Sequence, residues 1–221
     1  MKRQHAPWLV TAAILVLALV GTGAQATHTP ADKVVAAGSK VVVAAPNAEV
    51  TLLSATMRTS KPTDLILAVS MECSIITDVQ TGPSTLAGAA DSATAEGTVR
   101  AWVEIDGVVV PINSISGQSQ GPPPPGNDSD KVTFCNRVHT QEAEDGEDDE
   151  DGLDKMRTYL ETKNANAFNW LRLNMGSGIH TIEVVGELTT NTSGSALGAE
   201  ALVGNRSLIA EPAKLANDAT I

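Results

Sequence analysis

TVRAWVEI-DG-VVVP, residues 98–111, is the stretch of sequence that decides the fold. Side chains alternate along its first eight residues, with Val99, Ala101, Val103 and Ile105 on one side and Thr98, Arg100, Trp102 and Glu104 on the other. Successive side chains of a strand point to opposite faces, so the first set predicts a buried face and the second a solvent-facing one. Asp106-Gly107 between two apolar runs predicts a type I′ hairpin turn, because both turn residues need positive φ. Pro111 then ends the second strand.

Extended segments separated by turn residues fill most of the remaining chain. They lie at 40–44, 49–57, 65–75, 131–138, 166–175, 179–188, 199–203 and 206–210. Leu153–Lys163 has helical spacing in its apolar residues, but Thr158, Tyr159 and Thr162 favour a strand, which we predict there. Aromatic residues make up only 3% of the chain, so the core must be aliphatic. The pattern predicts an all-β chain folded as a single antiparallel β-sandwich of about eight to ten strands, jelly-roll-like in its topology.

Two segments of low complexity interrupt the strands. Gly117–Asp130 contains the four prolines Pro122–Pro125, which prefer an extended polyproline conformation and cannot join a sheet ladder. Gln141–Asp154 holds nine of the 26 acidic residues and is too self-repelling to fold on its own. We expect both to be long, mobile loops in the same region of the surface. Thr81–Glu96, rich in Ala, Ser, Thr and Gly, is expected to be a third mobile connection.

The first 26 residues have the pattern of a cleavable signal peptide. Lys2 and Arg3 precede an uncharged apolar stretch, and Ala24-Gln25-Ala26 provides small residues at the positions that a signal peptidase inspects. We therefore expect residues 1–26 to be removed and residues 27–221 to form the domain of a secreted protein, extracellular or in the cell envelope, with no membrane span after cleavage. The alternative is an uncleaved anchor, because the uncharged stretch is close to the lower limit of about 17 residues for a spanning helix.

Charge and cysteine content narrow the class of partner. The net charge is −11 and Lys and Arg form no cluster, which argues against nucleic acid as a partner. Cys73 and Cys135 are the only cysteines, and in an exported protein we expect them to form a disulfide with each other. Free thiols or an intermolecular bridge are the alternative. A metal site built on them is not supported, because no C-x-x-C pair occurs.

The acidic run contains the candidate metal ligands Asp149, Asp151 and Asp154. With Gly152 as the turn glycine of an EF-hand, the first and last positions would be Glu147 and Thr158, where such a loop needs Asp and a bidentate Glu. We therefore expect no cofactor. Weak calcium binding by the clustered carboxylates is the alternative to a simply solvated loop.

Trp102, with its neighbours Arg100 and Glu104, is the candidate ligand-binding group. An exposed Trp on a sandwich face can stack on a sugar ring, and the alternative is that the ring is covered. Gly117-Gln118-Ser119-Gln120-Gly121 has the spacing G-x-S-x-G, but it lies in the low-complexity segment Gly117–Asp130 and not at the strand-to-helix turn that a nucleophile elbow needs. His139 and His180 have no nucleophile at a suggestive spacing. We predict that the protein is not an enzyme.

Three stretches near the C-terminal end carry a resemblance. Residues 165–170 (ANAFNW), 176–184 (GSGIHTIEV) and 205–212 (NRSLIAEP) resemble a pattern in uncharacterised secreted bacterial proteins. Within them, G-x-G-x-H-T-I-x-V and R-S-L-I-x-E resemble jelly-roll sandwiches of the complement C1q and tumour-necrosis-factor type. The resemblance covers about the last sixty residues. It implies a jelly-roll sandwich and self-association, and it assigns no site residues.

These observations favour an exported, non-enzymatic structural or interaction module. Its expected partner is an extracellular protein, a glycan or further copies of the same chain in a homo-oligomer. A carbohydrate-binding or weakly calcium-dependent module is the alternative, and a hydrolase is the third and least favoured reading.

Overall fold

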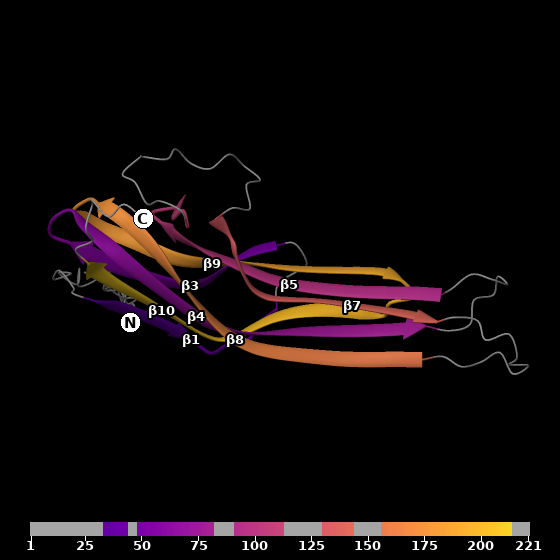
Figure 1. Ribbon diagram of the computed structural model, residues 1–221. Coiled ribbons are helices and arrows are strands. Elements are labelled where there is room, and N and C mark those ends of the chain that lie inside the picture. The colour runs from indigo at the N-terminus through magenta and orange to yellow at the C-terminus, as the bar shows by residue number, and fades with distance from the viewer. Residues whose placement is uncertain (1–32, 44–47, 82–90, 113–129, 144–155, 214–221) are drawn as a thin grey trace, which may run out of the picture.

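The protein is a β-sandwich of two antiparallel sheets packed face to face (Figure 1). The computed structural model describes residues 33–43, 48–81, 91–112, 130–143 and 156–213. Ten strands lie within these ranges, so the predicted fold class is confirmed. The predicted signal peptide lies outside the described residues. No helix that could span a membrane occurs among those that are described.

Each sheet contains five strands. Sheet A has the order β1-β10-β4-β8, with β2 also paired to β10, and is built from β1 (Val34–Gly38), β2 (Val42–Val43), β4 (Thr63–Thr81), β8 (Met156–Met175) and β10 (Gly198–Ala213). Sheet B has the order β3-β9-β5-β6, with β7 also paired to β5, and is built from β3 (Ala48–Thr59), β5 (Asp91–Ile105), β6 (Val108–Val109), β7 (Val132–Ala143) and β9 (Gly178–Gly194). From β8 onward every strand lies in the opposite sheet to the one before it, and the chain wraps as in a jelly roll.

The predicted hairpin is present. Asp106 and Gly107 both have positive φ, 53° and 76°, and join β5 to the short strand β6. Val99 and Val103 are fully buried, as their alternation indicates. Pro111 follows the end of β6, also as expected.

Several strands are longer than the sequence indicates. β7 continues to Ala143, so residues 141–143 belong to a strand and not to the acidic loop. β5 begins at Asp91, so the second half of the expected connection over 81–96 is also strand. Both extensions pair along their whole length in register. Residues 156–163 belong to β8, which confirms the strand that we predicted over the ambiguous segment.

The proline-rich and acidic segments attach at opposite ends of the sandwich, contrary to our expectation. Residues 113–129 and 144–155 lie outside the described residues, but their flanks are placed (Figure 1). Ile112 and Asp130 meet at one end, where the Ile112 backbone N–H donates to Asp130 Oδ1 at 3.2 Å. Ala143 and Met156 end β7 and begin β8 at the other end.

The sandwich is elongated and has two halves (Figure 1). We define the distal half by its strand segments, which are Ile76–Thr81, Asp91–Glu96, Val138–Ala143, Met156–Glu161, Asn191–Gly194 and Gly198–Glu200. The turn Ser195–Leu197 also belongs to the distal half, and the other described residues form the proximal half. The proximal half holds the main core, with Trp170, Leu67 and Leu208 fully buried. The distal half holds a small separate cluster of Val79, Ala93 and Ala95.

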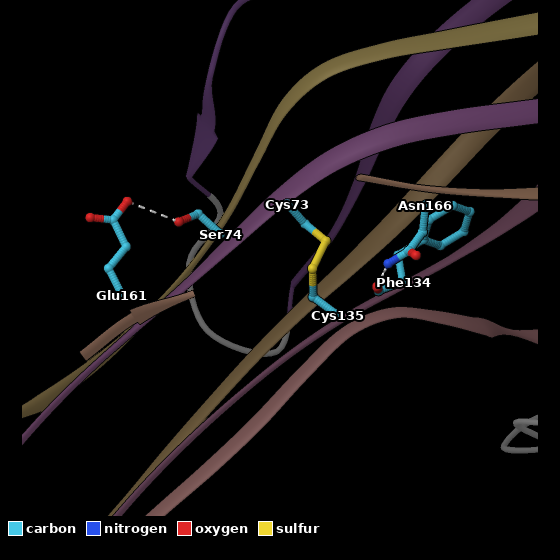
Figure 2. Close-up of a disulfide and its surroundings, with 6 residues drawn as sticks. All are labelled: Cys73, Ser74, Phe134, Cys135, Glu161 and Asn166. Carbon is cyan, nitrogen blue, oxygen red and sulfur yellow. Dashed lines mark hydrogen bonds between the residues drawn. A yellow bond between two sulfur atoms is a disulfide. The ribbon is translucent and has the colours of Figure 1, made fainter. Parts of the chain in front are cut away.

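A disulfide joins the two sheets beside the junction of these halves (Figure 2). Cys73 on β4 in sheet A bonds to Cys135 on β7 in sheet B, and both are buried, so the predicted pairing is confirmed. At the same level the sheets approach closely, because a Cβ on Gly97 would lie 2.6 Å from Ile75 Cγ2. Only glycine fits this position without displacing Ile75.

Candidate functional site

The candidate sugar-stacking residue Trp102 is buried, so the expectation of an exposed ring is wrong. Trp102 lies on the outer face of sheet B, as its alternation indicates, yet it is only 3% exposed. The Lys131 ammonium lies 4.6 Å from the ring centroid, and the indole N–H donates to Glu104 Oε1 at 2.8 Å. Because a sugar ring stacks on an open aromatic face, this arrangement offers no platform for one.

Charged side chains surround Trp102 on that face. Lys131 Nζ lies 3.0 Å from Glu187 Oε2 and 3.7 Å from Glu49 Oε1. Arg100, the third residue of the predicted site, sits opposite Glu187 in the register between β5 and β9. The predicted site residues thus lie close together, but the indole is buried, and Lys131, with its ion pairs to Glu187 and Glu49, lies over it. A lysine alkyl chain and its ammonium cover an aromatic face in this way through packing and cation–π attraction.

The predicted calcium ligands Asp149, Asp151 and Asp154 lie outside the described residues. Within the described ranges, no group of three or more His, Cys, Asp or Glu side chains is close enough to hold a metal ion.

The two described histidines are far apart and hold turns or packing contacts. His180, at the proximal end, has Nδ1 2.7 Å from Asp106 Oδ2 and Nε2 3.0 Å from the Gly176 carbonyl oxygen. His139, in the distal half, has Nδ1 3.5 Å from Thr77 Oγ1. Asp106 also accepts from the Thr181 backbone N–H at 2.8 Å. Partial burial raises the pKa of the Asp106 carboxyl, but the hydrogen bonds from His180 and Thr181 outweigh it, so its pKa lies below the ordinary value.

An apolar band crosses the outer face of sheet A in the proximal half. The register sets Val35, Ile209 and Ala68 side by side on β1, β10 and β4. In the neighbouring row Ile66 sits beside Leu171 on β8. Val35 is 62% exposed and Leu171 42% exposed, and the other three are half-buried. We call these five residues the apolar band.

Small side chains continue this face toward the junction of the halves. The next row contains Ala37, Ser207, Ser70 and Ala167. The hydroxyls of Ser70 and Ser207 lie 2.7 Å apart and bond to each other across β4 and β10. All four side chains of this row are small, so the surface beside the band has no protruding side chain.

A polar depression follows at the junction. Two hollows of about 470 and 400 Å³ share Glu72 and Asn205 in their walls. Asn205 Nδ2 donates to Glu72 Oε2 at 2.9 Å, and Lys163 Nζ lies 3.5 Å from the same oxygen. Ser74 donates to Glu161 at 3.2 Å (Figure 2). The polar groups here pair with one another and none of these contacts singles out a ligand.

The outer faces of the two sheets therefore differ in the proximal half. Sheet B presents ion pairs over Trp102, and sheet A presents the apolar band. A signal for the band exists in the sequence. Leu65–Leu67 and Leu208–Ala210 are continuous apolar runs where a half-exposed strand would alternate, and such runs indicate that both faces of a strand are apolar.

No protein-family model and no curated protein matches this chain. The architecture stands as a two-sheet antiparallel β structure, and its function has to be argued from the surfaces described above.

Proposed function

We propose that the protein is an exported, non-enzymatic structural module that assembles with further copies of itself. The observation that carries this proposal is the apolar band on sheet A. Large side chains such as Val35 and Leu171 stand exposed there in one contiguous group, next to a low row of small residues. Contiguous apolar surface on a water-soluble sandwich marks an interaction site.

A second copy of the chain is the occupant that suits this face. A two-fold axis sets a patch against itself, and two flat sheet faces with small residues beside an apolar band can approach closely. Charges of both signs border the band, since Lys33 Nζ lies 3.6 Å from Glu211 Oε2 at its edge. The C1q and tumour-necrosis-factor resemblance in the last sixty residues or so also implies self-association.

Solution mass tests this proposal. Sedimentation equilibrium of the mature protein is expected to give a multiple of the chain mass that falls on dilution. Lysines at two band positions, Val35→Lys with Leu171→Lys, are expected to give a monomer, because burying unpaired charge in an apolar contact is strongly unfavourable.

Ile179→Lys is the matched control. Ile179 is 59% exposed, similar to Val35, but lies on β9 in sheet B. This variant is expected to keep the wild-type mass. A wild-type chain that is monomeric at every attainable concentration would overturn the proposal and leave an unidentified extracellular partner as the occupant of the band.

A further inference from the structure

β8 is a long strand with one unpaired edge. It pairs with β4 from Met156 to Met175, and in the part of the chain that the structure describes it pairs with no other strand. An edge strand exposes a row of backbone N–H and C=O groups that can template pairing with another strand.

Shortness, proline and a bulge in mid-strand, three of the devices that blunt a sheet edge, do not occur in β8, although it carries charged residues such as Lys163. Edge strands are commonly short, bulged or interrupted by proline. β1 has five residues and β2 two, and the pairing of β3 is broken by a register shift at Thr51/Leu53. β8 has 20 residues without Pro or Gly, and its only register shift lies near its end, opposite Thr63/Leu65.

The middle of β8 is exposed to solvent, although Arg137 of β7 donates to Thr162 Oγ1 and Asn166 donates to the Phe134 carbonyl oxygen across the sandwich. Asn164–Ala167 are four consecutive exposed residues with small or medium side chains. Just before them, Glu161 and Lys163 point to the outer face of sheet A, as their registry with the outward Ile76 and Ser74 shows. Thr162, between them, points into the sandwich.

We propose that β8 pairs antiparallel with β8 of a second copy about a two-fold axis at Thr162, which joins the two A sheets into one continuous sheet. This inference rests on the proposed self-assembly and names a second contact for it, distinct from the apolar band. In this register Glu161 of each copy lies directly opposite Lys163 of the other.

Charge selects this register over its neighbours. An axis at Glu161 or at Lys163 would set two like charges against each other. An axis at Leu160 would oppose Arg157 to Lys163. Opposite charges directly across an antiparallel pair stabilise it and like charges destabilise it. Lys163 is 66% exposed even while it contacts Glu72, so it remains accessible to a second carboxylate.

Charge exchange tests the register. Glu161→Lys alone and Lys163→Glu alone each replace two attractive pairs per dimer by two repulsive ones, and each is expected to weaken β8-mediated association roughly tenfold. The double variant Glu161→Lys/Lys163→Glu restores both pairs and is expected to associate like the wild type. If the double variant associates more weakly than both single variants, the register is wrong.

A cysteine at the axis tests the same geometry by cross-linking. Thr162→Cys sets two thiols opposite each other, where Cβ atoms are about 5 Å apart, so a local approach of the strands of roughly 0.5–1 Å brings them to the distance of a disulfide. It is expected to give a disulfide-linked dimer on a non-reducing gel. Tyr159→Cys, the control on the same strand, lies three residues from the axis, so its thiols would be about 20 Å apart and no dimer is expected. Cross-linking of both or of neither would overturn the inference.

These outcomes separate the two interfaces. If the mass depends on the band variants while the β8 variants behave as wild type, the edge contact fails and the proposed function stands. If Thr162→Cys forms a cross-linked dimer and Val35→Lys with Leu171→Lys does not change its mass in solution, the edge contact stands and the apolar band is not an interface.

Discussion

The proximal and distal halves share six long strands, but their interiors are filled in different ways. The proximal half is packed with large apolar side chains, among them Trp170 against Phe168, with ring centroids 4.8 Å apart. Between the distal sheets lie Val79 and small alanines, together with polar side chains such as Thr77 and Gln141. Buried polar groups must pair to avoid a desolvation cost, so the distal half depends on hydrogen bonds that the proximal half does not need.

The strand count differs between the halves as well. β1, β2, β3 and β6 lie only in the proximal half, so the distal half consists of two three-stranded sheets, β10-β4-β8 and β9-β5-β7. Because the distal half buries less apolar area, its strands are held together by backbone hydrogen bonds, by buried polar contacts and by the nearby disulfide. The hydrogen bond between Gln141 and Thr81 is the contact that we call the polar seam. The two halves are thus a packed end and a hydrogen-bonded end of one sandwich.

The largest expected loss of stability comes from removing a large core side chain in the packed end. Trp170 is fully buried, and Trp170→Ala is expected to lower the free energy of unfolding by about 3–5 kcal/mol. Val79→Ala, the comparison in the distal half, removes two carbons and is expected to cost about 1.6 kcal/mol. Urea denaturation monitored by circular dichroism measures both. Equal losses would show that the two interiors contribute alike and would remove the distinction between the halves.

Removing the disulfide tests what holds the hydrogen-bonded end. Cys73 and Cys135 are 62 residues apart, and chain-entropy loss predicts that Cys73→Ala/Cys135→Ala costs about 4 kcal/mol. Amide hydrogen exchange is expected to locate the greater loss of protection in the distal strand segments, since these rely most on the tie between sheets. A uniform loss over both halves would instead indicate that the bridge acts only through the unfolded chain.

Removing the polar seam is expected to change the free energy of unfolding by less, and a second substitution is expected to reverse the loss. Gln141 is 7% exposed, and its Nε2 donates to Thr81 Oγ1 at 3.0 Å. Gln141→Leu leaves the buried Thr81 hydroxyl without this hydrogen bond and is expected to lower the free energy of unfolding by about 1–3 kcal/mol. Thr81→Val added to it removes the stranded group, so the double variant is expected to be close to the wild type or more stable. Thermal denaturation of the three variants checks this. If the double variant is the least stable, the seam contributes through more than its hydrogen bonds.

The strands of the packed end were predictable from the sequence, but two segments of the hydrogen-bonded end, residues 91–96 and 141–143, were not. Strict alternation in Thr98–Ile105 and the Asp-Gly turn predict β5 and its hairpin, because burial on one face enforces a period of two. In residues 91–96 and 141–143 the inward side chains of Ala93, Ala95 and Gln141 are small or polar, so no such period marks these segments. They become strands because they pair with each other, and residues 93–96 also pair with β9, which extends that far.

Of the candidate sites, the disulfide was predictable and the surfaces were not. A chain with two cysteines has one possible intramolecular pairing, and the signal-peptide pattern led us to expect it. Trp102 was placed on the correct face of its strand, but alternation cannot show that Lys131, just before β7, lies over the ring. The apolar band joins Val35, Ile66 and Ile209 from three strands, and only the strand order brings them together.

Acid gives the smallest expected effect and compares one carboxylate from each half. The hydrogen bond from Arg157 lowers the pKa of Asp78 in the distal half, although desolvation opposes it, and the contacts of Asp106 lower its pKa at the proximal end. A carboxyl whose pKa is lower in the folded state contributes stability that is present above its unfolded pKa, near 3.8, and is lost as the pH falls through the folded pKa. Both groups are reached by solvent, which screens the contribution.

Unfolding curves of the wild type, Asp78→Asn and Asp106→Asn from pH 6 to pH 2 are expected to show each variant slightly less stable at pH 6 and equal to the wild type at pH 2. Asn tolerates the positive φ of residue 106, so the turn is retained and the difference reports the charge. If Asp106→Asn is as costly at pH 2 as at pH 6, the carboxylate at the packed end holds its turn by shape and not by charge. Only the hydrogen-bonded end would then be weakened by acid.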